Sequence, residues 1–410
     1  MTPLDLTYMG TKRQLSPAIA EIVCAAKKGI ALDLFSGMCA IGSAIAPRRQ
    51  VWNNDIQRFA ASVAAALFTP SSQPPRPQIV ADRLYEYYRH NHEVLSTRYR
   101  QQIEKERATL NAKQISPVKE YLSTYKDSHL NPQALTELAQ LRSNPSQFPY
   151  RLFSLLYADT YFGVSQCVEI DSIVYAIQAS AKDREFTPSQ RLWLILSLGR
   201  ALQRIATTTG HFAQYLEPKN ATLSRYLVQR DKPVWDTWLY SIPMEGPIAT
   251  EDWRKGNLVF NQDSLQLLSN LRRRKIRPSV VYADPPYTKD QYSRYYHVLE
   301  TLLTYDYPKV SGKGRYRDDR FFTPFSHKRT AVNAFRKMAA QTAALEADIV
   351  VSYPANGLLN QLKVDPQALL KEHFRKVLVC LKTTHFHSTM GASKGTAAES
   401  VTEVVYWGAL

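Results

Sequence analysis

The sequence predicts an α/β protein in which a seven-stranded, doubly wound sheet is interrupted by a large, mainly helical insertion. Two early apolar runs, residues 30–37 and 51–55, flank a glycine-containing turn and a helical segment. Five further strand-like runs appear only after residue 250, and the stretch between has helical spacing without strand–helix alternation. Because two strands alone cannot form a stable sheet, we expect all seven runs to belong to one sheet.

The expected elements follow in a clear order along the chain. A first helix is predicted from Ser16 and Pro17, which suit a helix start, and the proline-rich segment 68–78 marks a boundary. Residues 189–210 have the clearest amphipathic helical pattern of the middle segment. We divide the chain accordingly into 1–78, 79–250 and 251–410. The later strands are expected within 257–263, 278–287, 347–357, 376–386 and 399–408.

Composition bears on the partner, the metal content and the location that we expect of the protein. The 410 residues carry a formal net charge of +16, which attracts polyanions such as nucleic acid, although charge alone is equally compatible with a basic enzyme that has no such partner. The four cysteines are scattered without a CxxC pair, which argues against a zinc site and a disulfide framework and fits a reducing cytoplasm. No apolar run is long enough to predict membrane insertion.

The segment "DLFSGMCAIG", Asp33 to Gly42, predicts a nucleotide-binding turn. Glycines after a strand let a ligand approach the backbone, and the helix that follows offers free N–H groups. Asp55 ends the next strand, where a carboxylate can accept hydrogen bonds from ribose hydroxyls. Cys39 stands where a second glycine is expected, so a strand–turn–helix without a ligand remains the alternative.

The block Asp284-Pro285-Pro286-Tyr287 follows the apolar run "SVVYA". Two prolines fix the backbone in an extended loop at the carboxyl edge of the sheet, where ligands of open α/β sheets bind. Asp284 and the carbonyl of Pro285 are then two fixed acceptors suited to an exocyclic amino group, and the ring of Tyr287 can stack on a planar base.

These blocks, in this order, resemble the Dam-like, adenine-specific DNA N6-methyltransferases. "YMGTKRQL" at 8–15 is similar to the family's N-terminal cofactor block, and "DLFSGMCAIG" to its cofactor loop. "NLVFNQDS" with Asp263 resembles a strand near the cofactor, and "YADPPYT" resembles the catalytic block. The order of the blocks is that of the alpha arrangement, in which the insertion is a target-recognition domain.

The resemblance implies a Rossmann-like methyltransferase sheet, S-adenosylmethionine as cofactor and double-stranded DNA as substrate. An adenine would be extruded from the duplex before its amino group attacks the methyl group. The residues that the resemblance assigns to the cofactor are Tyr8, Gly10, Lys12, Asp33, Phe35, Gly37, Asp55 and Asp263. Those that it assigns to catalysis are Asp284, Pro285, Pro286 and Tyr287.

Two basic segments flank the catalytic block. The run 272–277 fits a solvated helix end, whereas 313–329 interleaves arginines with aromatic residues and predicts a DNA-facing loop. Tyr292 and Tyr295 fit either the protein core or a pocket for the extruded base. The residues predicted to bind nucleic acid are Arg315, Arg317, Arg320, Lys328 and Arg329.

Several alternatives remain open at this point. Cytosine-N4 or RNA adenine methylation uses the same amino-group chemistry, and a non-catalytic DNA-binding protein is a third reading. No Pro-Cys dipeptide exists, which excludes the cytosine-C5 class. We expect no metal site, since His385 and His387 lack neighbouring ligand-type residues. We further expect a monomer in the cytoplasm, associated with the nucleoid when bound to DNA, with a cognate restriction or defence nuclease as a possible partner.

Overall fold

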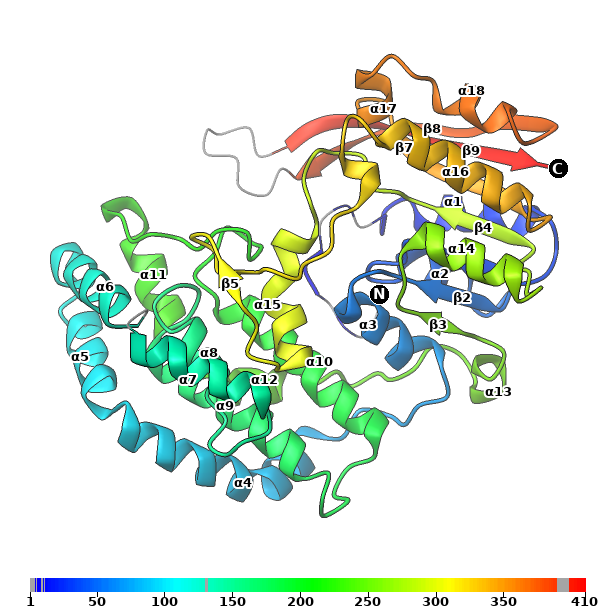
Figure 1. Cartoon of the computed structure of the whole chain (residues 1–410). Helices are drawn as coiled ribbons and strands as arrows, with labels where there is room; N and C mark the ends of the chain where they lie inside the picture. The colour runs from blue at the N-terminus through cyan, green and yellow to red at the C-terminus, as the bar shows by residue number, and fades with distance from the viewer. Residues whose placement is uncertain (1–3, 5, 9, 11, 130–131, 389–397) are drawn as a thin grey trace.

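A computed structural model describes residues 4, 6–8, 10, 12–129, 132–388 and 398–410, with the backbone alone for 126–129, 385–388 and 398–400. Its larger sheet confirms the expected class and contains the seven predicted strands. Figure 1 shows this sheet with its helices on the right and the helical part of the chain at the lower left. The strands of the sheet are β1 (Ala31–Asp33), β2 (Val51–Asn54), β3 (Val259–Phe260), β4 (Val280–Ala283), β7 (Asp348–Pro354), β8 (Lys376–Ser388) and β9 (Ala398–Ala409).

The order of strands across the sheet is β3-β2-β1-β4-β7-β9-β8. All neighbours from β3 to β7 are parallel, whereas β9 runs antiparallel to both β7 and β8. Within this sheet β9 therefore runs opposite to the other six strands. As a result the first residues of β9 lie at the edge where β4 and β7 end.

Helices cover both faces of the sheet. Successive strand residues alternate between two cores: Leu32 and Val281 pack with α14 and α16, while Ala31 and Val280 pack in the core that contains α1 and α3. This alternation explains why the strands read as continuous apolar runs. The helices of this part are α1 (Ser16–Ala25), α2 (Ala40–Ile45), α3 (Arg58–Phe68), α14 (Ser264–Arg273), α16 (Ala331–Ala343), α17 (Leu358–Gln361) and α18 (Pro366–Lys371).

The helical part occupies the chain between β2 and β3, as the spacing predicts. The amphipathic segment at 189–210 forms a helix that begins at Pro188, where Thr187 accepts a hydrogen bond from the N–H of Gln190. Its helices are α4 (Pro77–Arg98), α5 (Arg100–Asn111), α6 (Ile115–His129), α7 (Pro132–Ser143), α8 (Leu152–Leu156), α9 (Val164–Ala179), α10 (Pro188–Ile205), η1 (Asn220–Thr222), α11 (Leu223–Arg230) and α12 (Val234–Ser241). The short helix α13 (Glu251–Arg254) follows this part, just before β3. No helix within the described ranges is both long and apolar enough to cross a membrane.

The segment after β4 differs in part from the loop that the sequence predicts. It starts with α15 (Ser293–Thr304) and a short antiparallel hairpin of β5 (Val310–Ser311) and β6 (Tyr316–Arg317), followed by η2 (Pro324–Ser326). Gly312 takes up a positive φ of 70° in the hairpin turn, a conformation that favours glycine. The hairpin was not predicted because its strands are only two residues long.

Asp171 of α9 joins the helical part to the segment that follows α15. Its carboxylate accepts hydrogen bonds from the backbone N–H groups of Phe153 and Ser154 at 2.8 Å each and from the Tyr305 hydroxyl at 2.6 Å. Burial raises the pKa of Asp171 to about 6, although these hydrogen bonds lower it in part. One buried side chain thus satisfies donors from α8 and from the end of α15.

We expect Asp171→Ala to lower the free energy of unfolding by about 3 kcal/mol, because it leaves several buried donors without an acceptor. Urea denaturation measures the effect. Asp231→Ala, at an exposed position after α11, is the matched control and should change stability by less than about 0.5 kcal/mol. Equal effects of the two substitutions would contradict the role given to Asp171.

Candidate active site

The carboxyl ends of β1, β2 and β4 surround one open cavity, whose empty space, counted together with the solvent at its mouth, is about 920 Å³. Because these strands are parallel neighbours, the residues that follow each of them meet at the same edge of the sheet. The residues predicted for the cofactor and for catalysis all line this cavity, namely Tyr8, Gly10, Lys12, Asp33, Phe35, Gly37, Asp55, Asp263, Asp284, Pro285, Pro286 and Tyr287. Met9 and Thr11 of the N-terminal block lie outside the described residues.

The turn after β1 brings its backbone close to Tyr8 and Asp55. Gly37 has a φ of 47°, and a Cβ atom on it would lie 3.0 Å from the Tyr8 ring. The N–H of Gly37 donates to Asp55 Oδ2 at 2.9 Å, and the N–H of Gln57 donates to Asp55 Oδ1 at 2.9 Å. These bonds fix the Asp55 carboxylate at the floor of the cavity.

Cys39, which stands where a glycine was expected from the sequence, adopts a backbone conformation that favours glycine. Its φ of 60° and ψ of 30° lie in the left-handed region, which glycine reaches without steric strain. The side chain is fully buried in the core beneath the turn. A non-glycine residue thus holds the left-handed position that precedes α2.

Carboxylates dominate the charge of the cavity. Among the described residues that line it, four aspartates face a single lysine. Burial, together with the negative charges of Asp284 and Asp55, raises the pKa of Asp33 to about 8. Burial also raises the pKa of Asp55 to about 6. Asp33 Oδ1 makes no hydrogen bond within the described part of the chain, so the cavity favours a cationic ligand.

The catalytic block lies in an extended loop after β4. Lys12 Nζ lies 3.1 Å from Asp284 Oδ1 and 5.2 Å from the centre of the Tyr287 ring. The N–H of Leu358 donates to the backbone oxygen of Tyr287 at 2.8 Å, and the Tyr287 ring meets that of Tyr353 edge-on at 6.3 Å between centroids. The loop is thereby held from both sides.

The structure separates the tyrosines that follow the catalytic block. Tyr292 lines the cavity, and Tyr296 is buried with its ring stacked on that of Tyr8 at 4.5 Å. Tyr295 lies outside the cavity lining and packs edge-on against His211 at 4.6 Å. Of the two residues that the sequence left undecided, only Tyr292 therefore reaches the cavity.

The expectation that Arg315 and Arg317 bind nucleic acid needs correction. Arg315 is buried, and its Nη2 lies 2.6 Å from Oδ1 of Asp159. Arg317 is also buried, at 2.7 Å from Asp306 and 2.8 Å from Asp319. Carboxylates already neutralise both guanidinium groups, so neither offers its charge to a phosphate.

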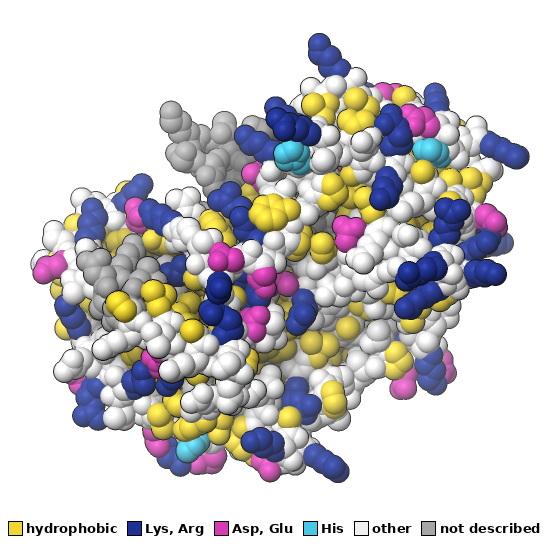
Figure 2. Space-filling model, viewed as in Figure 1, with side chains coloured by type: hydrophobic (Ala, Val, Ile, Leu, Met, Phe, Trp, Pro, Cys, Tyr) yellow, Lys and Arg dark blue, Asp and Glu magenta, His cyan; other side chains and the backbone are white. Residues whose placement is uncertain are grey.

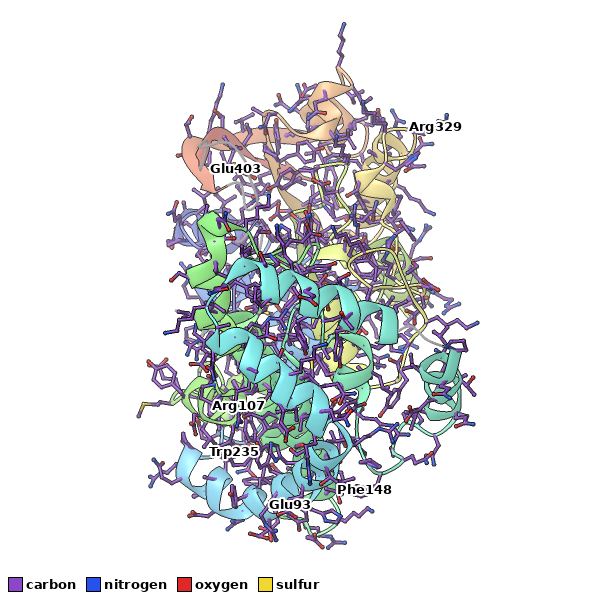
Figure 3. All side chains as sticks on the ribbon, turned by 90° about the vertical axis from the view of Figure 1, so that its left-hand side faces the viewer. Glu93, Arg107, Phe148, Trp235, Arg329 and Glu403 are labelled. Carbon is purple, nitrogen blue, oxygen red and sulfur yellow. The ribbon has the colours of Figure 1, made fainter. Side chains whose placement is uncertain are left out.

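Of the other three predicted nucleic-acid contacts, Lys328 and Arg329 are exposed and Arg320 is half-buried. Lys328 and Arg329 are exposed in the turn before α16, and Figure 3 shows Arg329 at the periphery of the part that holds the sheet. The Arg320 guanidinium lies 4.6 Å from the Phe322 ring, whose side chain is 64% exposed. The run 272–277 is exposed at and beyond the end of α14, as expected of a solvated helix end.

Sequence reasoning missed several residues of the site. Phe321 and Thr323 line the cavity from the segment after the hairpin, and Asn54 lines it from the end of β2. Glu403 of β9 lies behind Lys12, with Oε1 at 3.4 Å from Nζ. A charged residue within the apolar run "VTEVVYW" was the signal that could have revealed Glu403.

No cluster of three or more metal-ligand side chains occurs among the residues that the structure describes. The side chains of His385 and His387, which the sequence did not favour as metal ligands, lie outside the described residues. The lining of the cavity in the described ranges consists of carboxylates, one lysine, uncharged polar residues, and apolar and aromatic residues, with no histidine.

Comparison with known proteins identifies a family whose sequence model matches this chain. The sequence model of the D12 class N6 adenine-specific DNA methyltransferases matches residues 8–191 and 255–352. These ranges contain the turn after β1, the catalytic block and the larger share of the helical part.

Three curated relatives carry names of the same kind. Modification methylase LlaI of Lactococcus lactis subsp. lactis is 24% identical over 199 residues, which cover 48% of this chain and 29% of the relative. Modification methylase StsI of Streptococcus sanguinis is 22% identical over 375 residues, 90% of this chain and 46% of the relative. Type II methyltransferase M.FokI of Planomicrobium okeanokoites is 26% identical over 214 residues, 52% of this chain and 29% of the relative. In each case the match spans less than half of the relative.

We expect Arg315→Ala to lower the free energy of unfolding by about 3 kcal/mol, because it leaves the buried Asp159 carboxylate without its partner. The same substitution should leave nucleic-acid affinity within about twofold, apart from the loss of folded protein. Arg320→Ala should show the reverse pattern, with near-normal stability and weaker binding to a DNA duplex. Urea denaturation and fluorescence anisotropy measure the two quantities, and a large loss of affinity in folded Arg315→Ala would restore it as a DNA contact.

Proposed function

Since the chain belongs to the D12 class N6 adenine-specific DNA methyltransferases, we propose that it transfers the methyl group of S-adenosylmethionine to an adenine amino group in duplex DNA. The observation that carries the proposal is the position of the Asp284–Tyr287 block. It closes one side of an acid-lined cavity at the carboxyl edge of the sheet, beside Lys12.

The residues of the cavity fit S-adenosylmethionine. The cofactor carries a sulfonium and an ammonium, and the lining offers Asp33, Asp55 and Asp263 besides Asp284. The Gly37 turn and Phe35 would border the cofactor, and Asp55 would accept hydrogen bonds from its ribose. Gly10 and Lys12 would border its methionine end. When bound, the cofactor supplies a methyl group whose bond to sulfur breaks with the electron pair left on sulfur.

The catalytic block binds and orients the adenine amino group. Asp284 and the carbonyl of Pro285 accept hydrogen bonds from the two N6 protons and so direct the nitrogen lone pair toward the methyl carbon. The Tyr287 ring stacks on the base. Once N6 has bonded to the methyl carbon it carries a positive charge, and it releases one proton to Asp284. The fixed loop contributes by positioning these groups before the reaction.

A base inside a duplex cannot reach this cavity, so the adenine would be extruded first. The surface beside the cavity suits DNA. Phe321 and Thr323 line the cavity, and the exposed ring of Phe322 stands between them in sequence with Arg320 beside it. Figure 2 shows Lys and Arg side chains over both parts of the molecule on the face viewed there, in keeping with the formal net charge of +16.

We further propose that the helical part, residues 79–250, selects the target sequence. It is large and lies beside the sheet, and the proposed methyl transfer uses none of its residues. The curated relatives are named as modification methylases or type II methyltransferases. By analogy a cognate nuclease is the proposed partner, and the enzyme would act as a monomer. RNA adenine and cytosine-N4 methylation are the competing substrates.

Incubation with labelled S-adenosylmethionine and duplex DNA, single strands or duplex RNA tests the proposal. We expect N6-methyladenine in duplex DNA alone. Asp284→Ala should reduce the transfer rate at least 100-fold, because it removes an acceptor from the amino group. Asp252→Ala, at an exposed position on α13, should retain full activity. Label only in RNA or in cytosine would replace the proposed substrate, and full activity of Asp284→Ala would overturn the mechanism.

The pKa of about 8 for Asp33 predicts a pH-dependent affinity for the cationic cofactor. A carboxylate attracts a cation and a neutral carboxyl does not, so binding should tighten about tenfold as the pH rises from about 6.5 to about 8.5. Asp33→Asn should bind more weakly at high pH and lose most of this dependence. Isothermal titration calorimetry with sinefungin, a stable cationic analogue, measures it, and an unchanged pH profile in Asp33→Asn would assign the dependence to another group.

A further inference from the structure

Lys12 lies buried between two carboxylates that come from distant parts of the chain. Its Nζ is 3.1 Å from Asp284 Oδ1 and 3.4 Å from Glu403 Oε1. The exposed fractions of the side chains are 7% for Lys12, 15% for Asp284 and 2% for Glu403. Because water screens these charges little, each carboxylate strongly affects how the ammonium interacts with the other.

The reversed direction of β9 puts Glu403 in this place. Glu403 pairs with Pro354 at the end of β7, and β7 ends at the same edge of the sheet as β4. A residue this early in an antiparallel strand therefore reaches the edge where the parallel strands end. Figure 3 shows Glu403 in the upper part of the molecule, on the strands of the sheet, far from the helical residues Glu93 and Trp235.

The charges of Lys12 and Asp284 explain why a second carboxylate, that of Glu403, affects the site. Burial alone would lower the pKa of Lys12, but Asp284 and Glu403 together raise it well above its usual value, so Lys12 is an ammonium. Burial raises the pKa of Glu403, and Lys12 lowers it in part. An ammonium with Asp284 as its single carboxylate partner would bind it more strongly and compete with any other donor for its oxygens.

We propose that Glu403 is a positioning residue for methyl transfer, which holds the Lys12 ammonium partly away from Asp284 and so keeps Asp284 a strong acceptor. This inference rests on the proposed function, in which Asp284 accepts from the adenine amino group and then takes its proton. Sharing the ammonium with Glu403 favours both steps. An unshared positive charge beside Asp284 would oppose its protonation.

Glu403→Gln tests the role, since it keeps the size of the side chain and removes its charge. In single-turnover experiments with saturating S-adenosylmethionine and duplex DNA, we expect the rate of methyl transfer to fall at least tenfold. The dissociation constants of both ligands should stay within about threefold. Glu106→Gln is the matched control, because Glu106 is equally a buried glutamate, bonded to the N–H groups of Val164 and Ser165 in the helical part; it should retain the wild-type rate.

A double-mutant cycle with Lys12→Met tests the contact in the ligand-free protein. If Glu403 acts through Lys12, the two substitutions should be non-additive in the unfolding equilibrium constant by at least fivefold, and adding Glu403→Gln to Lys12→Met should cause no further loss of rate. Unchanged turnover in Glu403→Gln, a loss confined to ligand affinity, or full additivity would each overturn the inference. A wild-type protein without methyl-transfer activity would instead contradict the proposed function, and the stability cycle would still decide whether Glu403 holds Lys12.

Discussion

The parallel pairing of β1 with β2 and β4 is the constraint on which the cavity depends, because it brings three strand ends, distant in sequence, to one edge. Asp33, Asp55 and Asp284 each end or follow one of these strands, so the sheet itself places the carboxylates together. Burial raises the pKa of both Asp33 and Asp55, the negative charges of Asp284 and Asp55 add to the rise for Asp33, and hydrogen bonds to backbone N–H groups offset part of this cost. The sheet thus holds carboxylates in proximity, and a bound cation would stabilise their ionised forms.

Residues from the N-terminal and C-terminal segments also lie at this edge of the sheet. The segment before α1 inserts Tyr8 and Lys12, and β9 supplies Glu403 from the far side. Tyr8 stacks on Tyr296 of α15, so the N-terminal segment is fixed by an aromatic contact as well as by an ion pair. A site built from such separated segments forms only when the whole sheet has folded.

The sequence predicted the features that depend on local pattern. Apolar runs identified all seven strands. The acids that end or follow strands identified the cavity, because the carboxyl ends of parallel strands lie at the same edge of the sheet. Pairings between distant segments were beyond such reasoning. Arg315 meets Asp159 across 156 positions of sequence, so a surface role for Arg315 was the natural but wrong reading. Glu403 was missed for the same reason, since its partner Lys12 lies near the other end of the chain.

The helical part and one face of the sheet share a single continuous core. Ile19 of α1 and Phe59 of α3 belong to the same buried cluster as Leu84 of α4, Trp193 of α10 and Leu299 of α15. A module that can be exchanged between enzymes needs a boundary with few buried contacts, whereas these described elements share one buried cluster. In the proposed role of the helical part, target preference would therefore change by substitution on the exposed surface of the helices, because replacing this part as a unit would expose the core of the sheet.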